Sequence, residues 1–324
     1  MATPHERSRV TALDPADAGT HAEVVALFDR AESASDHPAL AEPSRLAWAA
    51  GGDFVGLVLR SHGAVAGYAQ LGWRDRSFTV EIVLDPDRTD KAGARRELLE
   101  AAASTAGRHG ATELRYWANL HNHVDENEIR TLGFSAERDL LQMRASLPLG
   151  VDRRPVDQAF SFRAFRPGHD EAAWLAVNNR AFAAHPEQGH WDLATLEARE
   201  KTSWFDPGGF ILCETQHTLA GSCWTKVHAD RQPHRGEIYV ISVDPAFQHR
   251  GLGRALALAG LDWLAQRVSV GMLYVDKTNQ GAVELYASLG FTIDHVDRCY
   301  LLEGPHGPTE PSGAGRKGPN GVAR

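Results

Sequence analysis

The chain contains the same ordered set of short motifs twice. In the first half, Val65-Ala66-Gly67 precedes an apolar strand that ends at Asp85-Pro86, and Leu132-Gly133-Phe134 follows later. The second half repeats these landmarks in the same order: Leu219-Ala220-Gly221, Asp244-Pro245 and Leu289-Gly290-Phe291. The three offsets are 154, 159 and 157 residues. Because the order and the spacing both recur, the sequence predicts a duplicated domain of about 150 residues.

Both halves show the same succession of apolar patterns. Each is expected to begin with a helix, at about 21–32 and 170–183, and then to form two strands, near 54–60 and 64–73 or 209–214 and 219–227. The strand ending at Asp-Pro follows, then a helix, a strand and a last helix. This pattern predicts an α/β fold with a mixed (α+β) sheet covered on both faces. We expect domains at 1–148 and 156–303, a linker between them, and a disordered tail over 304–324.

Composition excludes several classes of protein. With 34 basic and 42 acidic residues the net charge is −8, so neither nucleic acid nor an anionic membrane is an expected partner. No apolar run approaches the roughly 18 residues that a membrane span needs, and the first residues lack the apolar stretch of a secretory signal. Three widely spaced cysteines suit neither a disulfide framework nor a zinc site. We therefore expect a cytoplasmic protein, monomeric, that acts on a small molecule.

The segment after Asp244 has the character of an anion-binding loop. A strand ends at Val243, and Gly251 and Gly253 open a helix whose apolar stripe continues through Leu256 and Trp263. Glycines there allow a ligand to approach the backbone, and the free N–H groups of a helix start bind anions. A nucleoside-triphosphate loop would need Gly-Lys-Ser/Thr, and a dinucleotide fingerprint a third glycine where Leu256 stands. A merely capped helix is the alternative.

The run Gln248-His249-Arg250-Gly251-Leu252-Gly253 resembles the pyrophosphate loop (Gln/Arg-x-x-Gly-x-Gly/Ala) of the GCN5-related N-acetyltransferases, and Asn279 through Gly290-Phe291 resembles their C-terminal motif. In that family, acyl-coenzyme A lies between two splayed parallel strands. The resemblance implies acetyl-CoA as acyl donor, with no metal. It places the following residues along the coenzyme: Ile241, Ser242, Val243, Gln248, His249, Arg250, Gly251, Leu252, Gly253, Arg254, Asn279, Gln280, Gly281, Ala282, Val283 and Glu284.

Further segments, among them Trp224-Thr225-Lys226-Val227-His228 and Asn178-Asn179-Arg180-Ala181-Phe182, resemble the mycothiol synthases, a tandem branch of the same family. These enzymes acetylate the cysteinyl amine of a cysteinyl-glucosaminyl-inositol. The resemblance implies acceptor contacts from these residues: Glu42, Glu187, Lys226, Glu237 and Tyr274. A tandem acetyltransferase for another amine, such as an aminoglycoside or a protein N-terminus, and a non-catalytic acyl-CoA sensor are the alternatives.

Two residues receive catalytic roles. Glu237 precedes Val243 by six residues on the strand that leads to the loop, so it is the expected general base. Tyr286 follows Asn279 by seven residues, two helical turns along one face, and in the family that position faces the thioester sulfur. It is the expected general acid. An exposed strand-end carboxylate and a packing tyrosine are the structural alternatives.

The first half departs from the loop pattern. After Asp85-Pro86 it has a single glycine, Gly93, with Asp87 and Asp90 where phosphates would lie, and no tyrosine that matches Tyr286. We expect this half to be catalytically silent, although Ile82, Val83 and Leu84 remain candidates for a coenzyme contact. His121 and His123 lack the additional ligands of a metal site.

Overall fold

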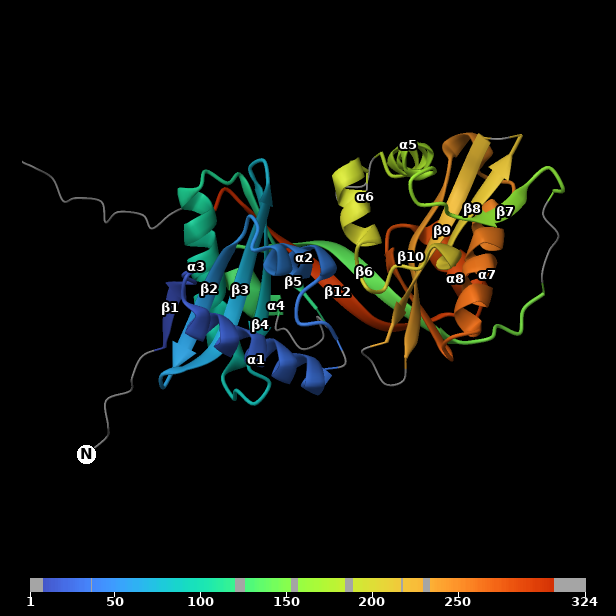
Figure 1. Cartoon of the computed structure of the whole chain (residues 1–324). Helices are drawn as coiled ribbons and strands as arrows, with labels where there is room; N and C mark the ends of the chain where they lie inside the picture. The colour runs from blue at the N-terminus through green and yellow to red at the C-terminus, as the bar shows by residue number, and fades with distance from the viewer. Residues whose placement is uncertain are drawn as a thin grey trace, which may run out of the picture. The chain divides into compact units, whose positions relative to one another are not determined.

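The computed structural model describes residues 8–35, 37–119, 126–152, 157–183, 189–216, 218–229 and 234–305. The chain divides into two compact units (Figure 1). Unit 1 takes the chain up to Arg138 and again from Asp297 onward, and unit 2 takes Asp139–Val296. No helix of the described residues is long and apolar enough to cross a membrane.

Unit 1 is a twisted sheet with helices on both faces. Its elements are β1 (Arg9–Ala12), α1 (Ala18–Ser35), α2 (Glu42–Ala50), β2 (Val55–Ser61), β3 (Ala64–Arg74), β4 (Ser77–Leu84), α3 (Lys91–Arg108), β5 (Glu113–Ala118) and α4 (Glu126–Thr131), with parts of β6 (Ser135–Ser146) and β12 (Thr292–Glu303). The strand order is β1-β2-β3-β4-β5-β12-β6. Strands β4 and β5 are parallel, whereas β12 runs antiparallel to β5.

Unit 2 repeats this plan. Its elements are β7 (Ser161–Ala164), α5 (Glu171–Ala181), α6 (Leu193–Glu200), the 3-10 turn η2 (Pro207–Gly209), β8 (Phe210–Thr215), β9 (Thr218–His228), β10 (Arg235–Val243), the 3-10 turn η3 (Pro245–Phe247), α7 (Leu252–Ala265), β11 (Val270–Asp276) and α8 (Gln280–Ser288), with the rest of β6 and β12. The order is β12-β6-β11-β10-β9-β8-β7. Strands β10 and β11 are parallel, and β6 pairs antiparallel with β11.

The predicted mixed α/β fold and the repeat are confirmed, and the expected helices and strands lie within a few residues of their predicted positions. The predicted domain boundaries, 1–148 and 156–303, differ from those of the compact units. The reason is an exchange of strands, because most of β6 pairs within unit 2 and the end of β12 pairs within unit 1. The short helices α2 and α6 were not anticipated, and nearly all of the predicted tail lies outside the described residues.

The repeated landmarks have structural causes. Gly133 and Gly290 follow helices α4 and α8 with φ of +87° and +91°, a conformation that favours glycine at a helix end. The phenylalanine after each glycine is buried. At Gly221 a Cβ would lie 2.5 Å from the backbone oxygen of Ser242, so only glycine allows β9 and β10 to pack as they do.

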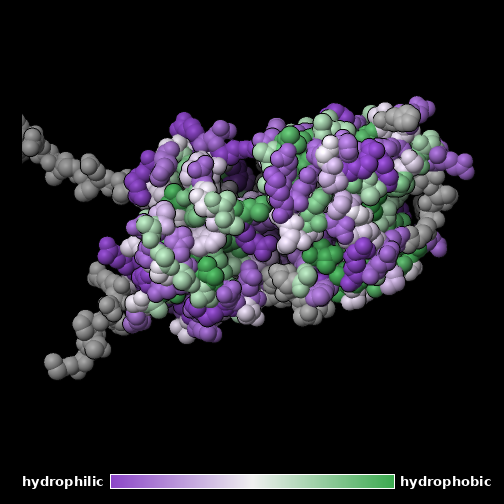
Figure 2. All heavy atoms as spheres, viewed as in Figure 1, coloured by the Kyte–Doolittle hydropathy of each residue, from purple (hydrophilic) through white to green (hydrophobic). Residues whose placement is uncertain are grey.

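Hydrophobic clusters fill both faces of each sheet. In unit 2, α7 and α8 cover one face through a cluster that includes Leu256, Leu261 and Leu273, while α5 and α6 cover the other around Trp174 and Trp224. The visible surface of each unit mixes hydrophilic residues with smaller hydrophobic areas (Figure 2). The large hydrophobic side chains exposed among the described residues come from five different elements: Val25, Trp73, Phe162, Leu193 and Ile293.

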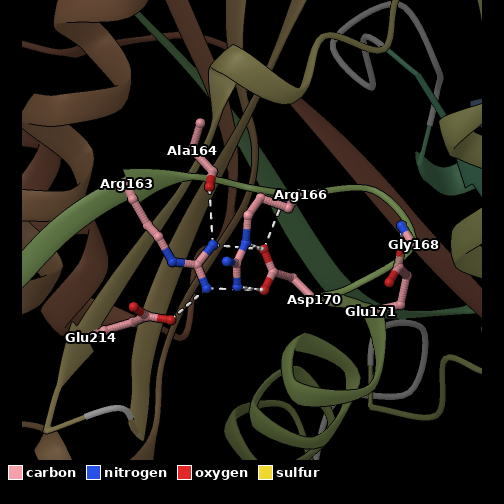
Figure 3. A network of polar contacts seen from close by, with 7 residues as sticks. All are labelled: Arg163, Ala164, Arg166, Gly168, Asp170, Glu171 and Glu214. Atoms are coloured by element: carbon pink, nitrogen blue, oxygen red, sulfur yellow. Dashed lines mark hydrogen bonds and ion pairs between the residues drawn. The ribbon is translucent and has the colours of Figure 1, made fainter.

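An ion-pair network anchors the first helix of unit 2 (Figure 3). Asp170, at the start of α5, accepts hydrogen bonds from Arg163 at 2.6 and 2.9 Å and from Arg166 at 2.8, 2.9 and 3.2 Å. Arg163 also pairs with Glu214 of β8 at 2.5 Å. Although burial opposes it, hydrogen bonding to the two arginines holds the pKa of Asp170 well below its usual range. The network thereby fixes α5 to the edge of the sheet.

Candidate active site

Strands β10 and β11 separate partway along their length. Their parallel register runs from Arg235↔Val270 to Ile238↔Leu273 and continues no further among the described residues, although β10 extends to Val243. The register of β10 against β9 shifts between Ile238 and Val240, which marks a bulge. Backbone groups of Ile241, Ser242 and Val243 are thus paired with β9 on one side, and on the other side, where β10 and β11 open away from each other, they have no pair with β11 among the described residues.

The loop that follows β10 leads into the start of helix α7. Gly251 occupies the N-cap position with φ of +79°, and no side chain caps the helix. Leu252, Gly253 and Arg254 form the first turn, preceded by the predicted loop residues Gln248, His249 and Arg250. An uncapped helix start carries free N–H groups and the positive end of the helix dipole. The loop therefore has the donors that a pyrophosphate requires.

Helix α8 lies against this helix start. Arg254 donates from Nη1 to Ser288 Oγ at 2.9 Å, and its buried Nε has no hydrogen-bond partner among the described residues. Asn279 caps α8 by accepting from the Ala282 N–H, so one of its polar atoms already has a local role. The predicted coenzyme segment occupies the first turns of α8: Gln280, Gly281, Ala282, Val283 and Glu284. A Cβ at Gly251 or Gly281 would meet nothing within 4 Å, so open space lies beside both turns.

The corresponding region of unit 1 differs in two respects. Strand β4 pairs with β3 in unbroken register, without the bulge found in β10. Helix α3 is capped by Asp90, whose carboxylate accepts from the Gly93 N–H at 2.8 Å and occupies the helix start with negative charge. Ile82, Val83 and Leu84 form the end of β4, beyond its last parallel pair with β5. The catalytic silence of the first half stays a prediction.

Glu237 lies on β10, on the sheet face covered by α5 and α6. It is 8% exposed, and its Oε2 lies 2.7 Å from Nε2 of His228 on β9. Lys226 is opposite Glu237 in the strand register, with its ammonium 4.4 Å from the ring centroid of Trp204 and 5.3 Å from that of Tyr239. Glu237 is therefore a buried carboxylate with a defined partner rather than an exposed strand-end residue, and its role as the base stays a prediction. The partner, His228, is the last residue of the segment Trp224–His228 that resembles the mycothiol synthases, but the sequence alone predicted no role for it.

Tyr286 lies on the opposite face, in the cluster of α7 and α8. It is 5% exposed and packs against Phe291. Burial, together with the nearby Cys223 thiol, raises the pKa of Tyr286 above its ordinary value, so its phenol stays protonated at neutral pH. Burial also raises the pKa of Cys223 to about 12 and that of Cys213 to about 11, so neither thiol is a ready nucleophile.

The structure places the remaining residues that were predicted to contact the acceptor substrate in three different ways. Tyr274 of β11 accepts a hydrogen bond from Gln142 Nε2 at 2.7 Å, on β6. Glu42 begins helix α2 in unit 1, and its contact with the acceptor stays a prediction. Glu187 lies outside the described residues, as do His121 and His123. Gln142 went unnoticed because it belongs to the other half of the sequence and enters unit 2 only through the exchange of β6.

An arginine–aspartate pair recurs at the turn after the splayed strand. In unit 2, Arg180 of α5 contacts Asp244 at 2.5 Å, and Asp244 also accepts from the Ala246 N–H. In unit 1, Arg30 of α1 contacts Asp85 at 2.8 Å. Since unit 1 keeps this pair without the glycine loop, the pair fixes the turn rather than binding the coenzyme.

Comparison with known proteins gives a consistent result. The model of the acetyltransferase (GNAT) family matches residues 172–291. A mycothiol acetyltransferase of Acidimicrobium ferrooxidans is 45% identical over 287 residues, covering 85% of this chain and 91% of that protein. A mycothiol acetyltransferase of Streptomyces griseus is 40% identical over 301 residues, covering 91% and 95%.

Solved structures share the fold. A tandem GNAT protein from the clavulanic acid biosynthesis pathway superposes with a TM-score of 0.70 at 18% identity, covering 94% of this chain and all of that one. A GCN5-related N-acetyltransferase from Sphaerobacter thermophilus gives a TM-score of 0.67 at 19% identity, covering 92% and 96%. Because relatives at 40–45% identity span most of the sequence, the chain belongs to the mycothiol acetyltransferase family, a tandem branch of the GNAT acetyltransferases.

Proposed function

We propose that this protein transfers the acetyl group of acetyl-CoA to the cysteinyl amine of cysteinyl-glucosaminyl-inositol, giving mycothiol and coenzyme A. The observation that carries the proposal is the opening between β10 and β11, which ends at an uncapped helix start in unit 2. The mycothiol acetyltransferases that resemble the chain over most of its length supply the identity of the acceptor.

The residues around the opening fit acetyl-CoA. The first N–H groups of α7 suit its pyrophosphate, and the buried Nε of Arg254, which bonds to none of the described residues, offers a further donor at the same helix start. The unpaired edge of Ile241, Ser242 and Val243 has the backbone groups to pair with the amide-rich pantetheine arm. When bound, acetyl-CoA supplies the activated acetyl group.

Each catalytic step then has a residue that suits it. Glu237 takes a proton from the attacking ammonium, directly or through water, so that the amine becomes nucleophilic. A backbone N–H of the splayed strand, that of Val243, stabilises the oxygen that gains charge during transfer. Tyr286, which burial keeps protonated, gives its proton to the departing sulfur. Base and acid lie on opposite faces of the sheet, so one group takes the proton from the amine and a different group protonates the thiolate that leaves the tetrahedral intermediate.

The proposal assigns catalysis to unit 2 alone. In unit 1, the Asp90 carboxylate occupies the helix start where the pyrophosphate would lie. The coenzyme contact of Ile82, Val83 and Leu84 and the acceptor contact of Glu42 remain part of the proposal. We propose that the protein acts as a monomer in the cytoplasm, without a metal and without nucleic acid or a membrane as partner.

The test is direct detection of product. The full chain is incubated with acetyl-CoA and cysteinyl-glucosaminyl-inositol, and the acetylated product is measured by mass spectrometry. We expect N-acetylation of this acceptor and little or none of an aminoglycoside or a peptide N-terminus. Glu237→Gln should lower kcat by about 10²–10⁴-fold. The matched control is Glu303→Gln, at the exposed end of β12, which should leave kcat unchanged. Coenzyme binding without acetylated product would contradict the proposal and favour a sensor.

A further inference from the structure

A buried chain of three polar side chains joins helix α5 to the end of strand β10. The indole Nε1 of Trp174 donates to Ser222 Oγ of β9 at 2.8 Å, and Ser222 Oγ lies 3.2 Å from Ser242 Oγ of β10. An indole N–H can only donate, so Ser222 accepts from Trp174 and has its own hydroxyl hydrogen to give to Ser242. Trp174 and Ser222 are fully buried and Ser242 is 3% exposed, so these hydrogen bonds replace those that water would make.

The corresponding positions of unit 1 carry different side chains. Val83 precedes the Asp-Pro turn by two residues, as Ser242 does in unit 2, and its register partner on β3 is Tyr68. Val24 precedes the arginine of the arginine–aspartate pair by six residues, as Trp174 does. All three unit 1 residues belong to one hydrophobic cluster. A hydrophobic core thus suffices to pack the helix on this face, and packing alone does not require the polar chain that unit 2 has beside its open strand edge.

The chain ends at the peptide group between Ser242 and Val243. The Ser242 carbonyl points toward β9, since a Cβ at Gly221 would lie 2.5 Å from its oxygen. The N–H of Asp244 points the same way and donates to the Ala220 carbonyl of β9 at 2.9 Å. Backbone N–H groups of successive residues alternate in direction along a strand. The Val243 N–H therefore points away from β9, to the side on which β10 and β11 open.

We infer that Ser222 and Ser242 are positioning residues that hold the Val243 N–H toward the thioester oxygen. This inference rests on the role that the proposed function gives to Val243. When the amine nitrogen adds to the thioester carbon, an electron pair of the C=O bond moves to the oxygen, which then needs a donor at a fixed place. Among the described residues the pairs between β10 and β11 end at Ile238, so β11 does not restrain this peptide. The polar chain to α5 supplies that restraint.

The variant Ser242→Ala removes the last hydroxyl of the chain without adding bulk. We expect kcat to fall about tenfold, short of the roughly 10²–10³-fold that removal of a whole oxyanion donor costs, with the acetyl-CoA KM within about twofold of wild type. A merely structural role would instead raise the acetyl-CoA KM, because the same strand edge is proposed to pair with the pantetheine arm. The matched control is Thr225→Val, which removes a buried β9 hydroxyl that donates to the Gly209 carbonyl at 2.8 Å and should leave kcat unchanged.

A double-mutant cycle tests whether the two hydroxyls act as one chain. Ser222→Ala alone should also lower kcat, and the double variant Ser222→Ala/Ser242→Ala should lie within about twofold of the slower single variant. Effects that multiply in the double variant would overturn the inference, as would a wild-type kcat in Ser242→Ala or a raised acetyl-CoA KM at unchanged kcat. If Ser222→Ala lowers the Tm by leaving the indole N–H without its acceptor, Ser242→Ala decides alone.

A second readout does not depend on the acceptor. Hydrolysis of acetyl-CoA passes through the same oxyanion, with water in place of the amine, so the slow release of coenzyme A thiol without an acceptor should fall in Ser242→Ala by the same factor of about ten. An unchanged hydrolysis rate would overturn the inference. Failure of the wild-type chain to acetylate cysteinyl-glucosaminyl-inositol would instead contradict the proposed function, so the two failures are distinguishable.

Discussion

At the scale of single residues, the proposed base depends on its neighbour. The imidazole of His228 lies 2.7 Å from the Glu237 carboxylate, and the side chains are 15% and 11% exposed. A buried carboxylate without a hydrogen-bond partner is costly, and an imidazole at this distance also fixes its orientation. His228 thus determines where the carboxylate points when it takes a proton.

We predict that His228→Phe lowers kcat about tenfold, because the ring is kept but the hydrogen bond to Glu237 is lost. His228→Gln, which can still donate to the carboxylate, should retain kcat within about threefold. Steady-state kinetics with saturating acetyl-CoA measure both variants. Equal and full activity in the two variants would show that Glu237 needs no partner.

Tyr286 gives a prediction about pH. Since burial and Cys223 raise its pKa, the phenol loses its proton only above the ordinary tyrosine value of about 10. The acid form is therefore present throughout pH 7–9.5, and kcat should show no decline there from Tyr286. Tyr286→Phe should lower kcat about 10²-fold at every pH in this range. A decline of wild-type kcat below pH 9 that Tyr286→Phe abolishes would contradict the assignment.

The sequence predicted some of these residues better than others. Glu237 and Tyr286 stand at fixed distances from motifs on their own strand and helix, so a local pattern located them. His228 is nine residues from Glu237 and meets it only because β9 and β10 are paired. Gln142 is 132 residues from Tyr274 and meets it only through the exchange of β6. No local periodicity reveals a contact of that kind.

At the scale of elements, the two helix starts differ in charge. Helix α7 begins with an uncapped turn, whereas Asp90 caps α3. The glycine pattern and the apolar stripe predicted α7 correctly, since it runs from Leu252 to Ala265. Helices α2 and α6 escaped prediction because they have only nine and eight residues, too few for a clear periodicity.

We predict that Gly253→Glu raises the acetyl-CoA KM tenfold or more, about 1.4 kcal/mol, because it brings a carboxylate to the pyrophosphate position. The Cβ itself fits, since its nearest neighbour, Leu285, lies at 3.8 Å. Ala92→Glu makes the same change at the second residue of α3 and should leave the acetyl-CoA KM unchanged. A rise in both variants would show that unit 1 also takes part in coenzyme binding during turnover.

The Asp170 network makes a prediction about stability. Asp170→Asn should lower the free energy of unfolding by about 1–2 kcal/mol at pH 7, because two arginines lose a charged acceptor. The folded pKa of Asp170 is lowered, so its contribution is present above the unfolded value of about 4 and is lost as pH falls through the folded value. The difference from wild type should therefore shrink below pH 4 in urea titrations. Glu197→Gln, in an exposed pair with Lys201, is the control and should change little.

At the scale of the whole molecule, the exchange of strands makes unit 2 dependent on the first half of the sequence. Seven residue pairs join β11 to β6, from Val270↔Ser146 to Asp276↔Leu140. Strand β6 and the segment after it also bring Leu141, Met143 and Leu147 into the core beneath α7. The duplication is visible in the sequence, but the boundary is not, because a repeat shows which segments correspond and not which half each strand joins.

We predict that a chain cut to residues 156–305, which starts at the domain boundary expected from the sequence, does not fold cooperatively. It lacks three large buried side chains, each worth about 1.5–3 kcal/mol, which together approach the whole stability of an ordinary domain. It also leaves the edge of β11 unpaired, which favours aggregation. A chain of residues 135–305 restores β6 and should show a cooperative thermal transition by circular dichroism. If both fragments melted at the same temperature, β6 would be dispensable, and unit 2 would be a domain of the second half alone.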